Sequence, residues 1–210
     1  AVMTTERPEA LDVAEELIDA GYGEQGAAIA FALDTIAARE LLEDWLDGEE
    51  GALGQRAGFH LAKFGNSEAL DQVKALAKNP DMEEALRMDA LALLRDNAPD
   101  TLSVSELMAL LEEEGRSAEF VTRVHEALGA TAEPEALTYL EEKVDAPFAD
   151  ERLDGISGIG YTGDPQHIET LAEIMQANAA PSLRERAIAG LGHLGGDEAA
   201  TILIEQLYRE

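Results

Sequence analysis

The chain has 210 residues, of which 46% are hydrophobic, so it can bury a sizeable core and a largely disordered chain is excluded. It contains no stretch of about 18 uninterrupted apolar residues, so the sequence predicts no insertion into a membrane. Cysteine is absent, which excludes disulfides, thiol nucleophiles and zinc sites built on cysteine.

The charge balance is strongly acidic, with 44 Asp and Glu residues against 15 Lys and Arg residues and a formal net charge of -29. Such a surface repels phosphate backbones, so we expect no nucleic-acid partner. Three explanations of the acidity stay open at this point. They are a solvated surface suited to a salty environment, electrostatic steering of a basic partner, and mimicry of nucleic acid.

The N-terminal segment AVMTTERPEA has neither the basic nor the apolar stretch of a signal peptide, so the sequence predicts a cytoplasmic protein. Because the chain does not begin with Met, a processed chain and a fragment of a longer one both stay open. After this segment, the spacing of apolar residues predicts three helices, at about 8–20, 24–34 and 35–47.

A helix–turn–helix unit recurs in the rest of the chain. Each copy has an apolar helix that ends in Gly or a small residue, a polar turn and a new amphipathic helix. Ala69, Ala136, His167 and Ala199 take equivalent places, at intervals of 67, 31 and 32 residues. The first interval is about two periods, so residues 83–114 are expected to hold a less regular copy.

The spacing within each copy is helical. Leu137, Leu140 and Val144 lie on one helix face, and Glu133-Pro134 places an acid before a Pro in the first turn, which favours a helix start. No stretch alternates with a period of two residues. We therefore predict an all-α fold of about six helix pairs, with a last helix at 197–208 that caps the stack.

Two segments, SLRERAIAGLGHLGGDEAATILIEQL and DERLDGISGIGYTGDPQHIETLAEIM, resemble HEAT-like repeats of the phycobilisome-lyase type. Arg152 and Arg184 match the arginine of the second helix in that repeat. Asp164-Pro165 and Asp197 match the turn between repeats.

This resemblance implies a right-handed α-α superhelix, that is, a HEAT-like or armadillo-type solenoid. We expect a single domain over residues 1–210. Residues 1–50 would form degenerate N-terminal helices, and residues 51–210 would form the clearer repeats.

The resemblance also implies that the second helices line a concave binding face. Basic residues are scarce in this chain, yet they recur in those helices, and Arg56, Arg123 and Arg186 share one equivalent position. An alternative, favoured for Arg152 and Arg184, is that the arginines bond to the adjacent repeat and hold the stack together. The candidate partner-binding residues are Arg56, His60, Lys63, Arg87, Arg123, His125, Arg152, Arg186 and His193.

Signals for enzymatic chemistry are weak. Deoxyhypusine hydroxylase, a relative of this repeat class, holds two irons with several His-Glu pairs, but here only His125-Glu126 forms such a pair, so we expect no metal site. The patterns G-x-S-x-G and H-E-x-x-H are absent. The run GISGIG at 155–160 lies in a predicted helix without Lys, so its glycines, like Gly190 and Gly192, are predicted to allow close helix packing. The acidic run at 112–114 is predicted to be a solvated helix end.

We therefore expect a non-catalytic scaffold or adaptor that needs no cofactor and binds another protein or a peptide segment through the concave face. One alternative is an accessory subunit of a lyase-type enzyme, which would show a compact pocket with buried titratable groups. A second alternative is an acidic inhibitor or immunity-type protein, whose binding to a basic partner would weaken steeply with salt.

Overall fold

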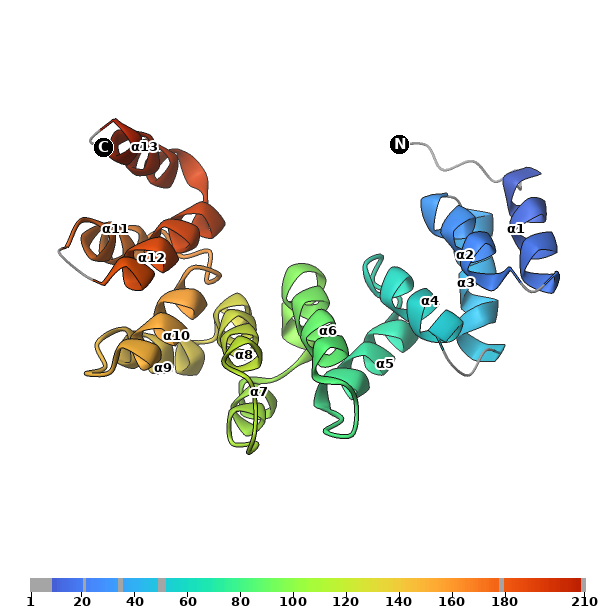
Figure 1. The fold of residues 1–210 in the computed structure, drawn as a ribbon, viewed down its shortest axis with the longest axis horizontal. Coiled ribbons are helices and arrows are strands. Elements are labelled where there is room, and N and C mark those ends of the chain that lie inside the picture. The colour runs from blue at the N-terminus through green and yellow to red at the C-terminus, as the bar shows by residue number, and fades with distance from the viewer. Residues whose placement is uncertain (1–8, 21, 34–35, 49–51, 178–179, 209–210) are drawn as a thin grey trace. The chain divides into compact units, whose positions relative to one another are not determined.

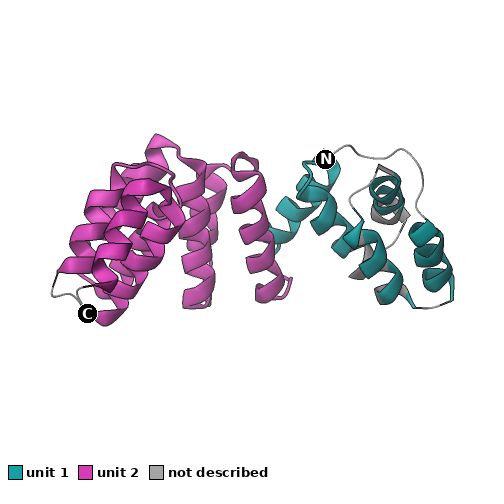
Figure 2. Cartoon of the chain, turned by 90° about the horizontal axis from the view of Figure 1, so that it is seen from above, with its two compact units in different colours: residues 1–79 teal, residues 80–210 magenta. Residues whose placement is uncertain are grey.

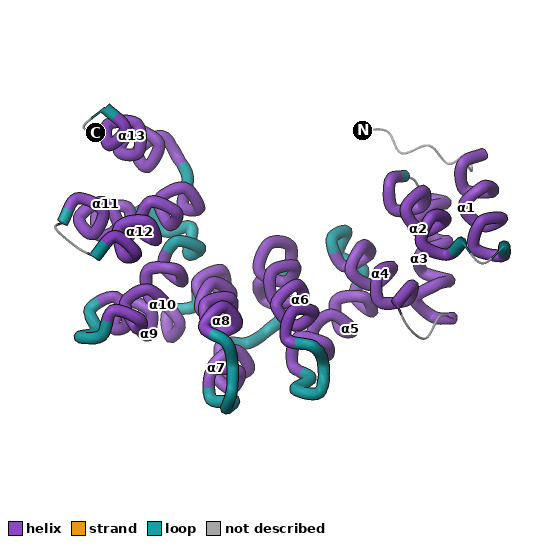
Figure 3. Tube along the Cα trace, viewed as in Figure 1, coloured by secondary structure: helices purple, strands orange, loops and turns teal. Residues whose placement is uncertain are grey.

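The computed structural model describes residues 9–20, 22–33, 36–48, 52–177 and 180–208 (Figure 1). These residues form thirteen α-helices and one short 3-10 helix, joined by loops, and they contain no strand (Figure 3). The all-α prediction is confirmed. The helices are α1 (Glu9–Asp19), α2 (Gly23–Ala32), α3 (Ile36–Gly48), α4 (Ala52–Ala62), α5 (Ser67–Lys78), α6 (Glu84–Asn97), η1 (Pro99–Thr101), α7 (Val104–Leu111), α8 (Ala118–Thr131), α9 (Pro134–Val144), α10 (Ala149–Ile159), α11 (His167–Gln176), α12 (Pro181–Leu194) and α13 (Gly196–Leu207).

The chain divides into two compact units (Figure 2). Unit 1, residues 1–79, contains α1 to α5, and unit 2, residues 80–210, contains α6 to α13. One continuous domain over the whole chain stays a prediction.

Unit 1 is built from helices that pack against their neighbours in the sequence. α1 packs on α2, α3 packs on α4, α4 packs on α5, and α2 also contacts α4. Leu11, Leu42, Leu61 and Val73 are buried between them. Asn66 is the N-cap of α5. Its side-chain carbonyl oxygen accepts a hydrogen bond from the backbone N–H of Ala69 at 3.0 Å.

Unit 2 has two layers of helices. The second helices of the repeats, α6, α8, α10 and α12, pack side by side in that order, and we call them the second-helix layer. α7, α9 and α11 pack against α8, α10 and α12, and α13 packs against α12. Apolar residues of both layers, such as Phe120, Leu128, Leu140 and Leu171, are fully buried between them. The less regular copy predicted at 83–114 is confirmed as α6, η1 and α7.

A residue with positive φ follows four of the second helices. The position is the same in each repeat: Gly65 has a φ of 78°, Ala132 of 52°, Gly163 of 66° and Gly195 of 68°. The left-handed backbone ends the helix and turns the chain toward the next first helix. Ala132 is the only residue other than glycine with a positive φ among the described residues.

Glycines bring the second helices together backbone to backbone. A Cβ atom on Gly129 of α8 would lie 1.9 Å from the carbonyl oxygen of Gly158 on α10, and one on Gly160 would lie 2.7 Å from the Cα of Gly190 on α12. The predicted role in close packing is confirmed at Gly158, Gly160 and Gly190. It is wrong for Gly192, where an added Cβ would meet no atom within 4 Å.

Candidate functional site

Side-chain bonds join each pair of neighbours in the second-helix layer. Arg95 of α6 forms an ion pair with Glu126 of α8. The hydroxyl of Thr122 on α8 donates to Asp154 of α10 at 3.4 Å. Arg186 of α12 donates from Nη1 to the hydroxyl of Ser157 on α10 at 2.6 Å. The exposed side of the layer therefore has a fixed polar surface rather than a set of independent charges.

A pocket of about 380 Å³ opens on this layer. Arg123 lies on its wall, with Nη1 3.0 Å from an oxygen of Glu126 and Nη2 3.8 Å from an oxygen of Glu119. The wall of the pocket thus offers guanidinium donors, carboxylate acceptors and a hydroxyl. It suits a ligand that has both hydrogen-bond donors and hydrogen-bond acceptors. The residues that line it are Ala118, Glu119, Thr122, Arg123, Glu126 and Arg186.

An aromatic pair lies on the second-helix layer where α10 and α12 end. The hydroxyl of Tyr161 is 3.0 Å from Nε2 of His193, and the two rings stack with centroids 4.2 Å apart. The guanidinium of Arg95 lies over the Tyr161 ring at 4.3 Å from its centroid. Burial raises the pKa of Tyr161, so its hydroxyl stays protonated at neutral pH. His193 is exposed and Tyr161 is half-buried, so the pair offers flat apolar contact area beside a polar edge.

Below this surface, His125 of α8 is buried and bonded through both ring nitrogens. Nδ1 lies 2.8 Å from the carbonyl oxygen of Val121, so it carries the proton, and Nε2 accepts from the hydroxyl of Tyr139 at 3.2 Å. Burial lowers the pKa of His125, so its imidazole is neutral at neutral pH. This arrangement leaves neither nitrogen for a partner.

Asp154 of α10 is a half-buried carboxyl that accepts the hydrogen bond from Thr122. Burial raises its pKa, while the hydrogen bond from the hydroxyl of Thr122 favours the charged form. Because Thr122 lines the pocket and also bonds to Asp154, this carboxyl is linked to the pocket wall by one hydrogen bond.

The structure brings together only some of the residues predicted to bind a partner. Arg123 and Arg186 line the same pocket, and His193 lies on the same layer. Glu126, Asp154 and Tyr161 belong to this surface too, but sequence reasoning missed them. The sequence did hold a signal for Tyr161, because this residue takes the place of the candidate residue His193 one repeat earlier.

Arg87 has no exposed surface with which to bind a partner. Its two terminal nitrogens donate to the two oxygens of Glu113 at 3.0 Å each, and its guanidinium lies over the ring of Phe120. Arg116 binds the same carboxylate. The prediction of a solvated helix end at 112–114 is therefore wrong for Glu113, which links α6 to the segment between α7 and α8.

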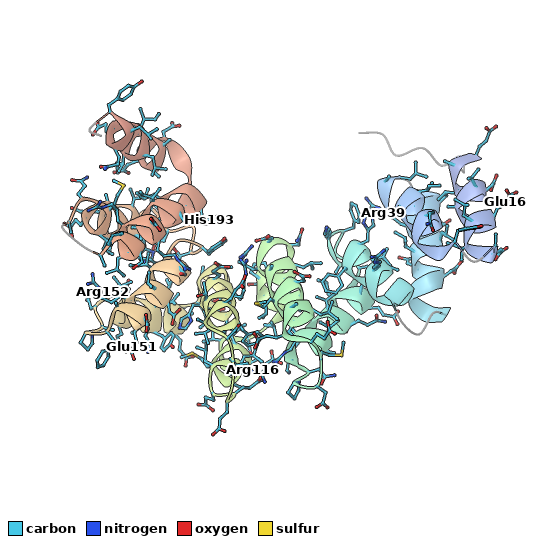
Figure 4. The ribbon with its side chains drawn as sticks, in the orientation of Figure 1. Glu16, Arg39, Arg116, Glu151, Arg152 and His193 are labelled. Carbon is cyan, nitrogen blue, oxygen red and sulfur yellow. The ribbon has the colours of Figure 1, made fainter. Side chains whose placement is uncertain are left out.

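Arg152 of α10 donates from Nε to the carbonyl oxygen of Val144 at 3.1 Å, where α9 ends (Figure 4). This bond supports the structural alternative for Arg152. It lies within one helix pair, however, rather than between adjacent repeats.

Three candidate residues belong to unit 1. Arg56 on α4 and Lys63, which follows α4, are exposed. His60 is half-buried and meets the ring of Phe64 edge-on, with centroids 5.2 Å apart. The guanidinium of Arg39 lies 4.0 Å from the centroid of that same ring.

Across the described part of the chain, no group of three or more His, Asp or Glu side chains is arranged to hold a metal ion. Over the same residues, no helix has the length and the apolar character needed to cross a membrane.

One copy of the helix–turn–helix repeat matches a known family of repeats. Residues 183–208 match the PBS lyase HEAT-like repeat. The matched segment covers most of α12, the turn at Gly195 and α13. The packing of the described helices in adjacent pairs is consistent with a HEAT-like repeat solenoid. No curated protein matches the chain.

Proposed function

We propose that this protein is a non-catalytic scaffold or adaptor that binds a segment of another protein on the second-helix layer of unit 2. The observation that carries the proposal is the pocket lined by Arg123 and Arg186, which lies on a continuous layer of four helices. Helical repeats commonly present such a layer to a partner, because stacking extends one surface over many residues.

The chemistry of the layer indicates how a segment would be held. The guanidinium groups of Arg123 and Arg186 and the carboxylate of Glu119 can pair with the C=O and N–H groups of an extended backbone. The stacked rings of Tyr161 and His193 can contact an apolar side chain. The two guanidinium groups and the stacked rings are held by contacts within the layer, so they need little ordering when a partner binds.

The proposal is tested by capture of the partner from a native lysate on tagged protein. Wild type is compared with an Arg123→Glu/Arg186→Glu variant and with Lys143→Glu, a control that introduces the same kind of charge change on α9. We expect the double variant to retain about tenfold less of the captured partner, since its pocket loses both guanidinium groups. Mass spectrometry quantifies the partner, and circular dichroism verifies the fold.

Equal retention by wild type and the folded double variant would contradict the proposal. Repeating the capture at low and high salt separates this function from that of an acidic inhibitor of a basic protein. The inhibitor would lose its partner steeply as salt rises, with or without the arginines.

One observation favours a second function, an accessory subunit of a lyase-type enzyme. Asp154 has a raised pKa, which is common among proton donors in active sites, and it accepts a hydrogen bond from Thr122 of the pocket wall. His125, however, is fully occupied by Val121 and Tyr139, which favours a packing role for this group. If Asp154→Asn abolishes a reaction of the captured complex without loss of the partner, the enzymatic alternative gains the stronger support.

A further inference from the structure

Arg186 is the arginine of the pocket wall that has no carboxylate partner among the described residues. Arg123, the other arginine of the wall, is paired with both Glu119 and Glu126. Arg186 instead donates from Nη1 to a neutral group, the hydroxyl of Ser157 on α10. The chain has 44 acidic residues, yet the described part of the fold places none of them at ion-pair distance from this guanidinium.

Asp154 of α10 does not take the role of an ion-pair partner. It interacts with Arg186 electrostatically, but its carboxylate accepts a hydrogen bond from the hydroxyl of Thr122. Arg186 is half-buried, so its charge is less screened by water than that of a fully exposed arginine. Because a guanidinium has several N–H donors, the bond to Ser157 leaves others for a ligand. A carboxylate from a partner would supply the missing counter-ion.

A second contact for a partner lies on the same face of α12. His193 follows Arg186 by about two helical turns, which is about 10 Å along the helix (Figure 4). Its exposed ring stacks on Tyr161, and the guanidinium of Arg95 lies over the Tyr161 ring. Arg95 is also paired with Glu126 of the pocket wall, so the stack and the pocket adjoin. An aromatic side chain of a partner can continue the stack on the exposed ring of His193.

The distance between Arg186 and His193 sets the spacing expected in a bound segment. An extended chain advances about 3.3 Å per residue, so about 10 Å corresponds to about three residues. Both contacts are made through side chains, whose reach adds or removes about one residue. The segment would therefore run along α12, with its two contacting side chains about two to four residues apart.

The net charge of -29 does not prevent an acidic segment from binding. In the pocket, Arg123 and Arg186 lie beside Glu119 and Glu126, so a ligand there meets little net charge. At physiological ionic strength, exposed charges more than about 8 Å apart are largely screened from one another. The guanidinium of Arg186, which is in contact with the ligand, then has more influence than distant acids on the surface.

We propose that the partner segment has an Asp or Glu side chain that pairs with Arg186 and, two to four residues away, an aromatic side chain that stacks on His193. This inference rests on the proposed function and names the chemistry of the segment that the second-helix layer binds. The ion pair between guanidinium and carboxylate fixes the position of the segment, because its geometry is directional. The aromatic stack adds contact area and fixes the direction of the segment along α12.

The test begins with a library of displayed random peptides, selected on the immobilised full chain at physiological salt. We expect the peptides that wild type retains to share an acidic and an aromatic residue at the stated spacing. One selected peptide is then synthesised with both termini blocked, so that only its side chains carry charge. A second version replaces its acidic residue by the corresponding amide. Fluorescence anisotropy measures the affinity of both versions for wild type and for variants whose fold is verified by circular dichroism.

The amide peptide should bind wild type about tenfold more weakly than the acidic peptide. The two versions should bind Arg186→Gln equally, because their difference depends on the guanidinium. Arg184→Gln is the matched control: Arg184 is a half-buried arginine of the same helix that does not line the pocket, so this variant should bind as wild type does. His193→Ala, which changes an exposed residue, should bind the acidic peptide about fivefold more weakly.

Two results would overturn this inference alone. They are selected peptides without a shared acidic residue, or an equal loss on amide substitution in wild type and in Arg186→Gln. If those peptides still bind more weakly to Arg123→Glu/Arg186→Glu, the proposed function stands and only the chemistry of the segment is wrong.

Two further results would overturn the proposed function as well. A selection that yields no binder of wild type leaves the layer without a peptide-binding role. Selected peptides rich in Lys and Arg, with affinity that falls steeply as salt rises, would favour the acidic inhibitor of a basic protein.

Discussion

At the scale of single residues, Ala132 stands out, because it alone among four equivalent turn residues is not glycine. Its φ of 52° is left-handed, and Gly65, Gly163 and Gly195 hold the same position in the other repeats. A side chain in this region crowds the following carbonyl oxygen, at a cost of about 1–2 kcal/mol. The turn after α8 therefore contains local strain that the other turns avoid.

Ala132→Gly should raise the free energy of unfolding by about 0.5–1 kcal/mol, because relief of the left-handed strain exceeds the extra flexibility of glycine in the unfolded chain. Chemical denaturation followed by circular dichroism measures the change. The converse variant, Gly163→Ala, should lose about 1 kcal/mol, although an added Cβ there meets no atom within 4 Å. If Ala132→Gly destabilises the protein, the turn does not carry this strain.

The side chains of the site show which residue roles a sequence can predict. Equivalent positions in the repeats correctly indicated that Arg123 and Arg186 share a surface. The buried ion pair between Arg87 and Glu113 could not be predicted, because Arg87 lies on α6 and Glu113 in the segment between α7 and α8, and their contact depends on how these two parts pack. In an acidic chain, each arginine has many possible carboxylate partners.

At the scale of helices, glycine pairs determine how closely the second helices approach. The contact between Gly129 and Gly158 leaves no space for even one methyl group. Such contacts gain packing at the expense of helix propensity, since glycine costs about 1 kcal/mol relative to alanine in a helix. The second-helix layer thus depends on these residues for its spacing.

Gly129→Ala should lower the free energy of unfolding by about 1–3 kcal/mol, because α8 and α10 must separate to admit the new methyl group. Gly192→Ala is the matched control, since it adds the same methyl group at the equivalent position of α12, where no atom lies within 4 Å. It should raise stability by up to about 1 kcal/mol through helix propensity alone. Calorimetry distinguishes the two signs, and a loss of equal size in both variants would refute the role of close contact.

The helices themselves follow closely from the sequence. The periodicity predicted helices at 8–20 and 197–208, and the structure has α1 at Glu9–Asp19 and α13 at Gly196–Leu207. The prediction of close packing is correct for the glycines of 155–160 and wrong for Gly192. Gly192 occupies the same repeat position on α12, but an added Cβ there would meet no atom within 4 Å. Local sequence patterns show which helix face carries small or apolar residues. Whether a neighbouring helix packs on that face depends on the place of the repeat in the stack.

At the scale of the whole molecule, the dominant property is the net charge of -29. Within unit 2, Arg95 and Arg186 form contacts within the second-helix layer, to Glu126 and Ser157, while acids such as Glu141 on α9 are exposed. In the pocket, Arg123 and Arg186 lie beside Glu119 and Glu126, so the pocket itself carries little net charge.

The most direct test of the central claim, that the second-helix layer of unit 2 is the working surface, is site-specific photo-crosslinking in a native lysate. A photoreactive side chain is placed at Glu119, which is exposed on the pocket wall, or at Glu142, which is exposed on α9 in the other layer. The account predicts a discrete crosslinked product from position 119 that Arg123→Glu/Arg186→Glu removes, and no such product from position 142. A product from position 142 alone, or equal products from both positions, would contradict it.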